Sequence, residues 1–256
     1  MKKNVLTIAG LDPSAGAGLA ADLKVFEHFD CNGFAMATAL TVQSSRGVFA
    51  VNAVEPTIIA AQGQALFKDF NITGVKLGML GNKEILLAVT ELLQTFKPIT
   101  IILDPILISS SGKRLLSLEG QEAMIKELLP LCSLITPNIP EAEALTGLEI
   151  TDEESTKVAG QQLLSMGPDA VLIKGGHSSG PPIDWLFTKG KSYNFKAVKH
   201  KGPGPHGTGC HLSSAILCLL AHGEDLPSAV QNAKTWLLQL IASSQKLGQG
   251  TPYIQI

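Results

Sequence analysis

The chain of 256 residues has few aromatic side chains, 5% of the total, and few charged ones, 16%. Hydrophobic residues still reach 45%, so the core must consist of alanine, leucine, isoleucine and valine rather than of rings. This content is ordinary for a folded enzyme and excludes an intrinsically disordered chain. The sequence also lacks an uncharged apolar run of the ~18 residues that a membrane span needs, so we expect no membrane partner.

An excess of basic residues is absent as well. The formal net charge is −2 and the isoelectric point is near 6.3, so we expect no nucleic-acid partner. The few cysteines show neither CxxC pairs nor the spacing of a zinc site, and we expect reduced thiols in a cytoplasmic protein. These cysteines are Cys31, Cys132, Cys210 and Cys218. The opening "MKKNVLTIAG" contains too short an apolar run for a targeting signal and predicts a first strand.

Apolar strand-like runs alternate with amphipathic helix-like runs along the chain. The predicted strands are 5–9, 34–41, 47–54, 74–80, 99–105, 132–138, 170–174, 184–188 and 193–200. The predicted helices are 17–29, 56–68, 83–96, 120–130, 140–147, 153–166, 211–221 and 228–245. This alternation predicts an α/β fold of three layers, with a mostly parallel sheet, helices on both faces and a late antiparallel pair. No repeat or linker divides the chain, so we expect 1–256 to be one domain.

Polar residues follow several of the predicted strands. They are Asp12, Gln43, Asp104, Asn138, Glu141, Lys174 and the loop before Cys210. In open parallel sheets, ligands bind beyond the carboxyl ends of the strands. The convergence of these residues therefore predicts an active site at that edge.

The segment "HGTGC", residues 206–210, opens a predicted helix. Its glycines allow a tight turn, and the first amides of a helix point outward as donors toward an anion. Three interpretations of Cys210 stay open: an inert core thiol, a hydrolase nucleophile with His206 as its base, or a proton acceptor in phosphoryl transfer. In the third, the amides of Gly207, Thr208 and Gly209 stabilise the transferred group, and the helix N-terminus favours a thiolate.

The turn "GLDPSAGAG", residues 10–18, contains neither the dinucleotide fingerprint nor a Walker loop. It is either a flexible turn capped by Asp12 or Ser14, or the wall of a small-molecule pocket within reach of Asp22. Gln43 places a donor beside an acceptor, which suits a ring nitrogen next to an amine, although a solvated amide is equally compatible.

Asp104, Asn138 and Glu141 have the oxygen donors that suit Mg²⁺ held through water and phosphates. The alternative is that Asn138 merely caps the helix beginning at Pro140. Lys174 ends a strand before two glycines and is either a phosphate contact or a surface lysine.

The ordered motifs resemble the hydroxymethylpyrimidine/phosphomethylpyrimidine kinases of thiamine biosynthesis, in the ribokinase-like superfamily. They are "TIAGLDPSAGAGLAADLK", "TVQSSRGV", "LGML", "ILDPILISSSG", "LITPNIPEAEAL", "LIKGGH" and "HGTGC". The resemblance runs from about Val5 to Trp236. It implies a three-layer ribokinase-like fold and ATP-dependent phosphorylation of 4-amino-5-hydroxymethyl-2-methylpyrimidine, then of its monophosphate to the pyrophosphate. It also implies a homodimer.

Residue roles follow from the same resemblance. Gln43, Gly10, Asp22 and Met79 would line the pyrimidine pocket, and Cys210 would stand where sugar kinases carry an aspartate base. Asp104, Asn138 and Glu141 would organise Mg²⁺, with Lys174 and Lys234 near the phosphates of ATP. The departures from the family pattern are Leu11, Ala15 and His211.

Two other function classes remain open at this point. A pyridoxal kinase of the same superfamily would bind a phenol and an aldehyde, a substrate that the amide of Gln43 suits less well. A hydrolase using Cys210 and His206, or a binding protein without chemistry, would need no ATP.

Overall fold

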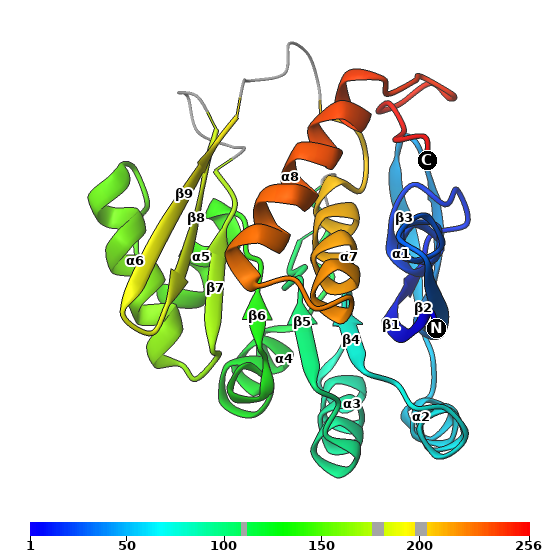
Figure 1. Cartoon of the computed structure of the whole chain (residues 1–256). Coiled ribbons are helices and arrows are strands. Elements are labelled where there is room, and N and C mark those ends of the chain that lie inside the picture. The colour runs from blue at the N-terminus through cyan, green and yellow to red at the C-terminus, as the bar shows by residue number, and fades with distance from the viewer. Residues whose placement is uncertain (109–111, 176–181, 198–203) are drawn as a thin grey trace.

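The structure is a computed structural model and describes residues 1–108, 112–175, 182–197 and 204–256 (Figure 1). Its strands are β1 (Lys3–Leu11), β2 (Cys31–Ser44), β3 (Gly47–Ala53), β4 (Gly74–Leu77), β5 (Thr100–Leu103), β6 (Leu134–Ile135), β7 (Ala170–Ile173), β8 (Ile183–Thr188) and β9 (Lys191–Lys196). Its helices are α1 (Gly18–His28), α2 (Pro56–Asp69), α3 (Lys83–Phe96), α4 (Leu118–Ala123), α5 (Ile139–Thr146), α6 (Glu153–Ser165), α7 (Thr208–Ala221) and α8 (Leu226–Ala242). Parts of "ISSSG", "KGGH" and "AVKHKGP" lie outside the described residues.

The strands form one sheet in the order β3-β2-β1-β4-β5-β6-β7-β8-β9. Neighbours from β2 through β7 run parallel. Antiparallel pairs close both edges: β2 with β3, and β7 with β8 and β8 with β9. The mostly parallel sheet and the late antiparallel pair are therefore confirmed, whereas the reversal at the β3 edge was not predicted.

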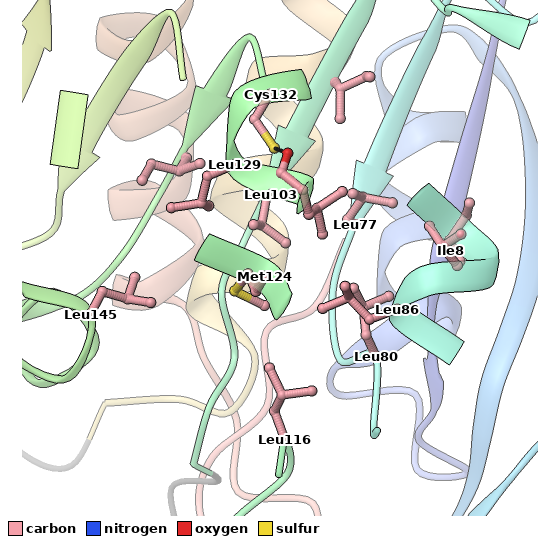
Figure 2. Packing of buried hydrophobic residues seen from close by; sticks show 14 of the residues in the cluster. Ile8, Leu77, Leu80, Leu86, Leu103, Leu116, Met124, Leu129, Cys132 and Leu145 are labelled. Carbon is pink, nitrogen blue, oxygen red and sulfur yellow. Dashed lines mark hydrogen bonds between the residues drawn. The ribbon is translucent and has the colours of Figure 1, made fainter. Parts of the chain in front are cut away.

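The buried side chains form two large clusters, one on each face of the sheet. Neighbouring strand residues alternate between them, so Leu103 packs with α2 to α6 while Ile102 packs with α1, α7 and α8. Figure 2 shows the first cluster, where Leu77 and Leu103 of the sheet meet Leu86 of α3. Burying each such leucine contributes about 1.5–3 kcal/mol. Helices on both faces confirm the three-layer fold.

Local sequence signals explain where several helices begin and end. The side chain of Asn82 accepts the Ile85 amide at the start of α3, and Gly147 ends α5 in the left-handed conformation. The predicted helix 120–130 differs most, because α4 gives way to a π-helical turn at Met124–Leu128 and a 3₁₀ turn at Leu129–Leu131.

The C-terminal segment after α8 returns to the far edge of the sheet. Gly250 and Thr251 donate amide hydrogen bonds to Ser45, just beyond β2, at 3.1 and 3.0 Å. Tyr253 and Ile254 are buried there. This covering of the β2 end was not predicted, because no sequence pattern links positions 205 residues apart.

Within the described residues, no helix is both long and apolar enough to cross a membrane. The four cysteines are free and buried, as expected for reduced thiols. Cys132 lies in the first cluster and its thiol donates to the Leu128 carbonyl oxygen at 3.3 Å (Figure 2). Cys218 lies in the second cluster.

Candidate active site

The N-terminus of α7 is built on a glycine that no other residue could replace. Gly207 caps the helix with φ of 79°, and a Cβ on it would lie 2.0 Å from the Gly16 carbonyl oxygen. The two glycine-rich loops, 10–18 and 204–207, therefore pack backbone against backbone. The amides in the first turn of α7 have no partner within the helix, which makes this end a donor site for anions.

A carboxylate and an ammonium group, each following a different strand, lie against this helix end. Lys174 Nζ, after β7, contacts Asp104 Oδ1, after β5, at 2.7 Å. A Cβ on Gly209 would lie 3.0 Å from Asp104 Oδ2 and 3.1 Å from Lys174 Nζ. Asp104 and Glu141 raise the pKa of Lys174 although burial opposes them, so its ammonium stays charged. The structure thus brings together three of the predicted site residues.

Glu141 and Asn138 lie beside this group at the start of α5. The side chain of Asn138 accepts the Glu141 amide, and that of Glu141 accepts the Asn138 amide, each at 2.8 Å. Asn138 therefore caps the helix, as its alternative interpretation expected. Burial raises the pKa of Glu141 to about 7; the charge of Lys174 lowers it and that of Asp104 raises it.

Asp104 and Glu141 offer the carboxylate oxygens that a divalent cation prefers, although the part of the chain that the structure describes contains no cluster of three or more Asp, Glu, His or Cys side chains that could hold a metal ion. Both side chains are buried, and the charge of Asp104 disfavours ionisation of Glu141, a cost that a bound cation would offset. Asn138 fits less directly, because its side-chain oxygen already accepts the Glu141 amide. Its role at a metal stays a prediction.

Cys210 is only 4% exposed, in the first turn of α7. Burial raises the pKa of its thiol to about 11, whereas Lys76 and the Gly18 amide favour the thiolate. The sequence predicts that the helix N-terminus favours a thiolate. In the structure, burial of the thiol raises its pKa by more than the helix N-terminus lowers it. The resting form of this thiol is protonated.

A buried ion pair that we did not predict lies behind Cys210. Lys76 of β4 contacts both carboxylate oxygens of Asp22, at 3.0 and 2.9 Å, and both side chains are fully buried. Thr7 and Ser214 donate to the same carboxylate at 2.6 and 2.8 Å. Asp22 thus joins β1, β4 and α7. The only signal for Lys76 is a charged residue inside the apolar strand "GVKL".

The predicted substrate residues lie on the β1–β2 side of α7. A Cβ on Gly10 would collide with Met79 Cε at 2.5 Å, so these two residues share one wall. Gln43 contacts His206, with 2.8 Å between its Nε2 and the ring Nε2, and His206 Nε2 lies 3.1 Å from Asp12 Oδ2. Because His206 is engaged with Gln43 and Asp12, the structure does not form the Cys210–His206 pair that a hydrolase would use.

Lys234 lies further away, on α8. Its ammonium donates to Asp184 Oδ2 and to the Phe195 carbonyl oxygen, each at 2.6 Å. Asp184 Oδ1 accepts the amide of Gly175, the residue after Lys174, at 2.9 Å. Asp184 thus links Lys234 to the residue that follows Lys174 at the end of β7. A contact between Lys234 and a nucleotide stays a prediction.

Comparison with known proteins identifies the family of this chain. A family model described as phosphomethylpyrimidine kinase matches residues 12–255. A hydroxymethylpyrimidine/phosphomethylpyrimidine kinase of Aquifex aeolicus is 46% identical over 246 residues, 96% of each chain.

Solved structures agree with these matches. A phosphomethylpyrimidine kinase from Clostridium difficile 630 superposes with a TM-score of 0.84 at 41% identity, covering 93% of this chain and 99% of that one. A Staphylococcus aureus pyridoxal kinase in complex with AMP-PCP and pyridoxal has a TM-score of 0.91 at 29% identity, covering 100% and 93%. The fold is therefore ribokinase-like, and the chain belongs to the phosphomethylpyrimidine kinase family.

Proposed function

We propose that this chain transfers the γ-phosphoryl group of ATP to the hydroxyl of 4-amino-5-hydroxymethyl-2-methylpyrimidine, and then phosphorylates the resulting monophosphate. The observation that carries the proposal is the approach of the α7 N-terminus to Asp104 and Lys174. Phosphoryl transfer needs positioning and charge stabilisation more than covalent chemistry, and this group supplies both. The relatives named above support the pyrimidine as substrate.

The amides of Gly207, Thr208 and Gly209 receive the transferring phosphoryl group, and Lys174 neutralises its charge. The substrate oxygen bonds to phosphorus, the bond from phosphorus to ADP breaks, and the hydroxyl proton passes to the Cys210 sulfur. The sulfur can accept that proton only as a thiolate, so the thiol first releases its own proton to solvent water. Lys76 and the Gly18 amide favour this thiolate form. Mg²⁺ held near Asp104 and Glu141 would offset the charge of the phosphates.

On the acceptor side, Gly10 and Met79 form the flat wall against which the pyrimidine ring lies. Gln43 hydrogen-bonds the edge of that ring. Asp22 is fully buried behind this wall, and its carboxylate, bonded to Thr7, Lys76 and Ser214, holds α1 against β1, β4 and α7. We further place Lys234 behind the nucleotide, where it anchors Asp184.

A second candidate activity is phosphorylation of pyridoxal. The observation that favours it is the structural match to the S. aureus pyridoxal kinase, which covers the whole chain. The higher identity to the pyrimidine kinases favours the pyrimidine as the better substrate.

A substrate panel tests the assignment. The purified chain is incubated with ATP, Mg²⁺ and either the pyrimidine alcohol, its monophosphate or pyridoxal, and ADP release and phosphorylated products are measured. We expect the highest kcat/KM for the two pyrimidines. A clear preference for pyridoxal would overturn the substrate, and no ADP release with any compound would overturn the kinase.

The remaining proposals concern the whole molecule. We propose that it is one domain, acts in the cytoplasm and forms a homodimer. An exposed apolar face on the β2–β3 hairpin supports the homodimer, with Leu40, Val42 and Phe49 between 50% and 61% exposed.

A further inference from the structure

The two polar neighbours of the His206 Nε2 atom require opposite hydrogen-bonding behaviour from it. Its Nε2 lies 3.1 Å from Asp12 Oδ2 and 2.8 Å from the Gln43 side-chain nitrogen. An ionised carboxylate only accepts hydrogen bonds, whereas an amide NH₂ only donates them. One ring nitrogen cannot satisfy both neighbours in this orientation.

Asp12 decides which neighbour prevails. Its Oδ1 accepts the Ser14 amide and hydroxyl at 2.9 and 2.6 Å, and its Oδ2 accepts the Ala17 amide at 3.0 Å. These three hydrogen bonds favour the ionised form, and the pKa of Asp12 is lowered although burial opposes it, so this residue is a carboxylate at neutral pH. Nε2 of His206 must therefore carry a hydrogen that acceptors such as Asp12 share, and it has no lone pair left to accept a hydrogen bond from the Gln43 N–H.

The same conflict exists at the other end of the Gln43 amide. Thr41 Oγ1 lies 3.2 Å from Gln43 Oε1, but it donates its one hydrogen to the Leu11 carbonyl oxygen at 2.8 Å. Two acceptors then face each other. Turning the amide by 180° resolves both conflicts, because its oxygen then accepts from His206 and its nitrogen donates to Thr41.

We propose that His206 is a positioning residue for the substrate: held by Asp12, it fixes the Gln43 carbonyl toward itself, so that Gln43 offers the ligand its remaining N–H. This inference rests on the proposed function, in which Gln43 binds the substrate. The ring atom that meets this N–H must be a hydrogen-bond acceptor, as a pyrimidine nitrogen is.

Other contacts keep the imidazole in place without affecting its donor. Tyr253 packs edge-on against the ring at 6.2 Å, and the His206 amide donates to the Pro252 carbonyl oxygen at 2.9 Å. The C-terminal segment thereby supports His206, which directly precedes Gly207, the cap of α7. His206→Phe keeps the ring and removes the donor, whereas His206→Gln keeps an N–H donor at nearly the same reach.

Kinetics of these variants test the role. We expect His206→Phe to raise KM for the pyrimidine alcohol about tenfold, the loss of one aligned hydrogen bond, with kcat and the KM for ATP nearly unchanged. His206→Gln should have a KM for the pyrimidine alcohol close to that of the unmodified chain. In a Gln43→Leu background, His206→Phe should have no further effect. Equal impairment by Phe and Gln, or an undiminished Phe effect in that background, would overturn the proposal.

A spectroscopic measurement tests the hydrogen position without any turnover. In the protein labelled with nitrogen-15 histidine, long-range proton–nitrogen spectra report which ring nitrogen of His206 is protonated, with His206→Phe identifying the signal. We expect a protonated Nε2. A bare Nε2 would overturn the positioning role even if the kinase is active, and a protonated Nε2 in an inactive protein would leave it intact while refuting the proposed function.

Discussion

At the scale of single residues, Cys210 carries the most specific chemical role. Replacing it with alanine removes the proton acceptor and leaves the amides of α7 in place. We expect Cys210→Ala to lower kcat by roughly 10²–10⁴-fold, the usual contribution of a positioned acid or base. Nucleotide affinity, measured by calorimetry, should change little.

Cys218 provides the matched control, since it is a fully buried thiol of the same helix. Cys218→Ala should reduce stability but not the turnover of the folded fraction. If Cys210→Ala retained turnover within a few-fold of the unmodified chain, Cys210 would be a packing residue only.

The raised pKa of Glu141 should make the free energy of unfolding depend on pH. Its pKa is raised to about 7 in the fold, so the folded state binds more protons than the unfolded chain between the two pKa values. The stabilisation from this group is therefore complete below its ordinary pKa and is lost as the pH rises through 7. Urea unfolding should show Glu141→Gln gaining stability relative to the unmodified chain between pH ~5 and ~8. A difference independent of pH would refute this account of Glu141.

At the scale of elements, the start of α7 depends on its cap. A Cβ on Gly207 would collide with the Gly16 carbonyl, whereas Gly223, beyond the other end of α7, also has positive φ but nothing within 4 Å. We expect Gly207→Ala to displace the first turn and abolish most phosphoryl transfer. Gly223→Ala should cost only ~1–2 kcal/mol of unfolding free energy and keep turnover. Similar kinetics for the two variants would show that the cap geometry does not matter.

The elements also show how far local sequence signals reach. Apolar periodicity predicted α3 and α5 closely, because this signal acts within a few residues. The start of α7 was expected three residues too late, since the left-handed Gly207 begins a helix that apolar spacing cannot show. The π-helical turn after α4 was missed for a similar reason, because the apolar spacing of 120–130 fits a regular helix.

The site was predicted in its residue types but not in its connections. Asp104, Glu141 and Lys174 were expected together because parallel strand ends share one edge, and the structure places them in one group. The partner of Asp22, Lys76, is 54 residues away and was not predicted, because tertiary packing decides such pairs. The engagement of Gln43 with His206, 163 residues away, has the same origin.

At the scale of the whole molecule, we expect two copies of the chain to associate through the β2–β3 edge of the sheet. Phe49 is 61% exposed on β3, the edge strand that pairs with β2, which carries the exposed Leu40 and Val42. We expect Phe49→Asp to weaken the homodimer by an amount that sedimentation equilibrium detects, because a charge would enter an apolar interface. Ile99→Asp is the control, since Ile99 is 82% exposed just before β5. A monomeric parent chain, or equal effects of both substitutions, would refute this surface.

The proposed mechanism requires the transferred phosphoryl group to bind at the N-terminus of α7. A crystal structure with a non-hydrolysable ATP analogue, Mg²⁺ and the pyrimidine alcohol tests this most directly. The γ-phosphoryl group should lie at hydrogen-bond distance, ~3 Å, from the amides of Gly207 to Gly209, with the substrate hydroxyl between it and Cys210. A terminal phosphate bound away from these amides would contradict the account.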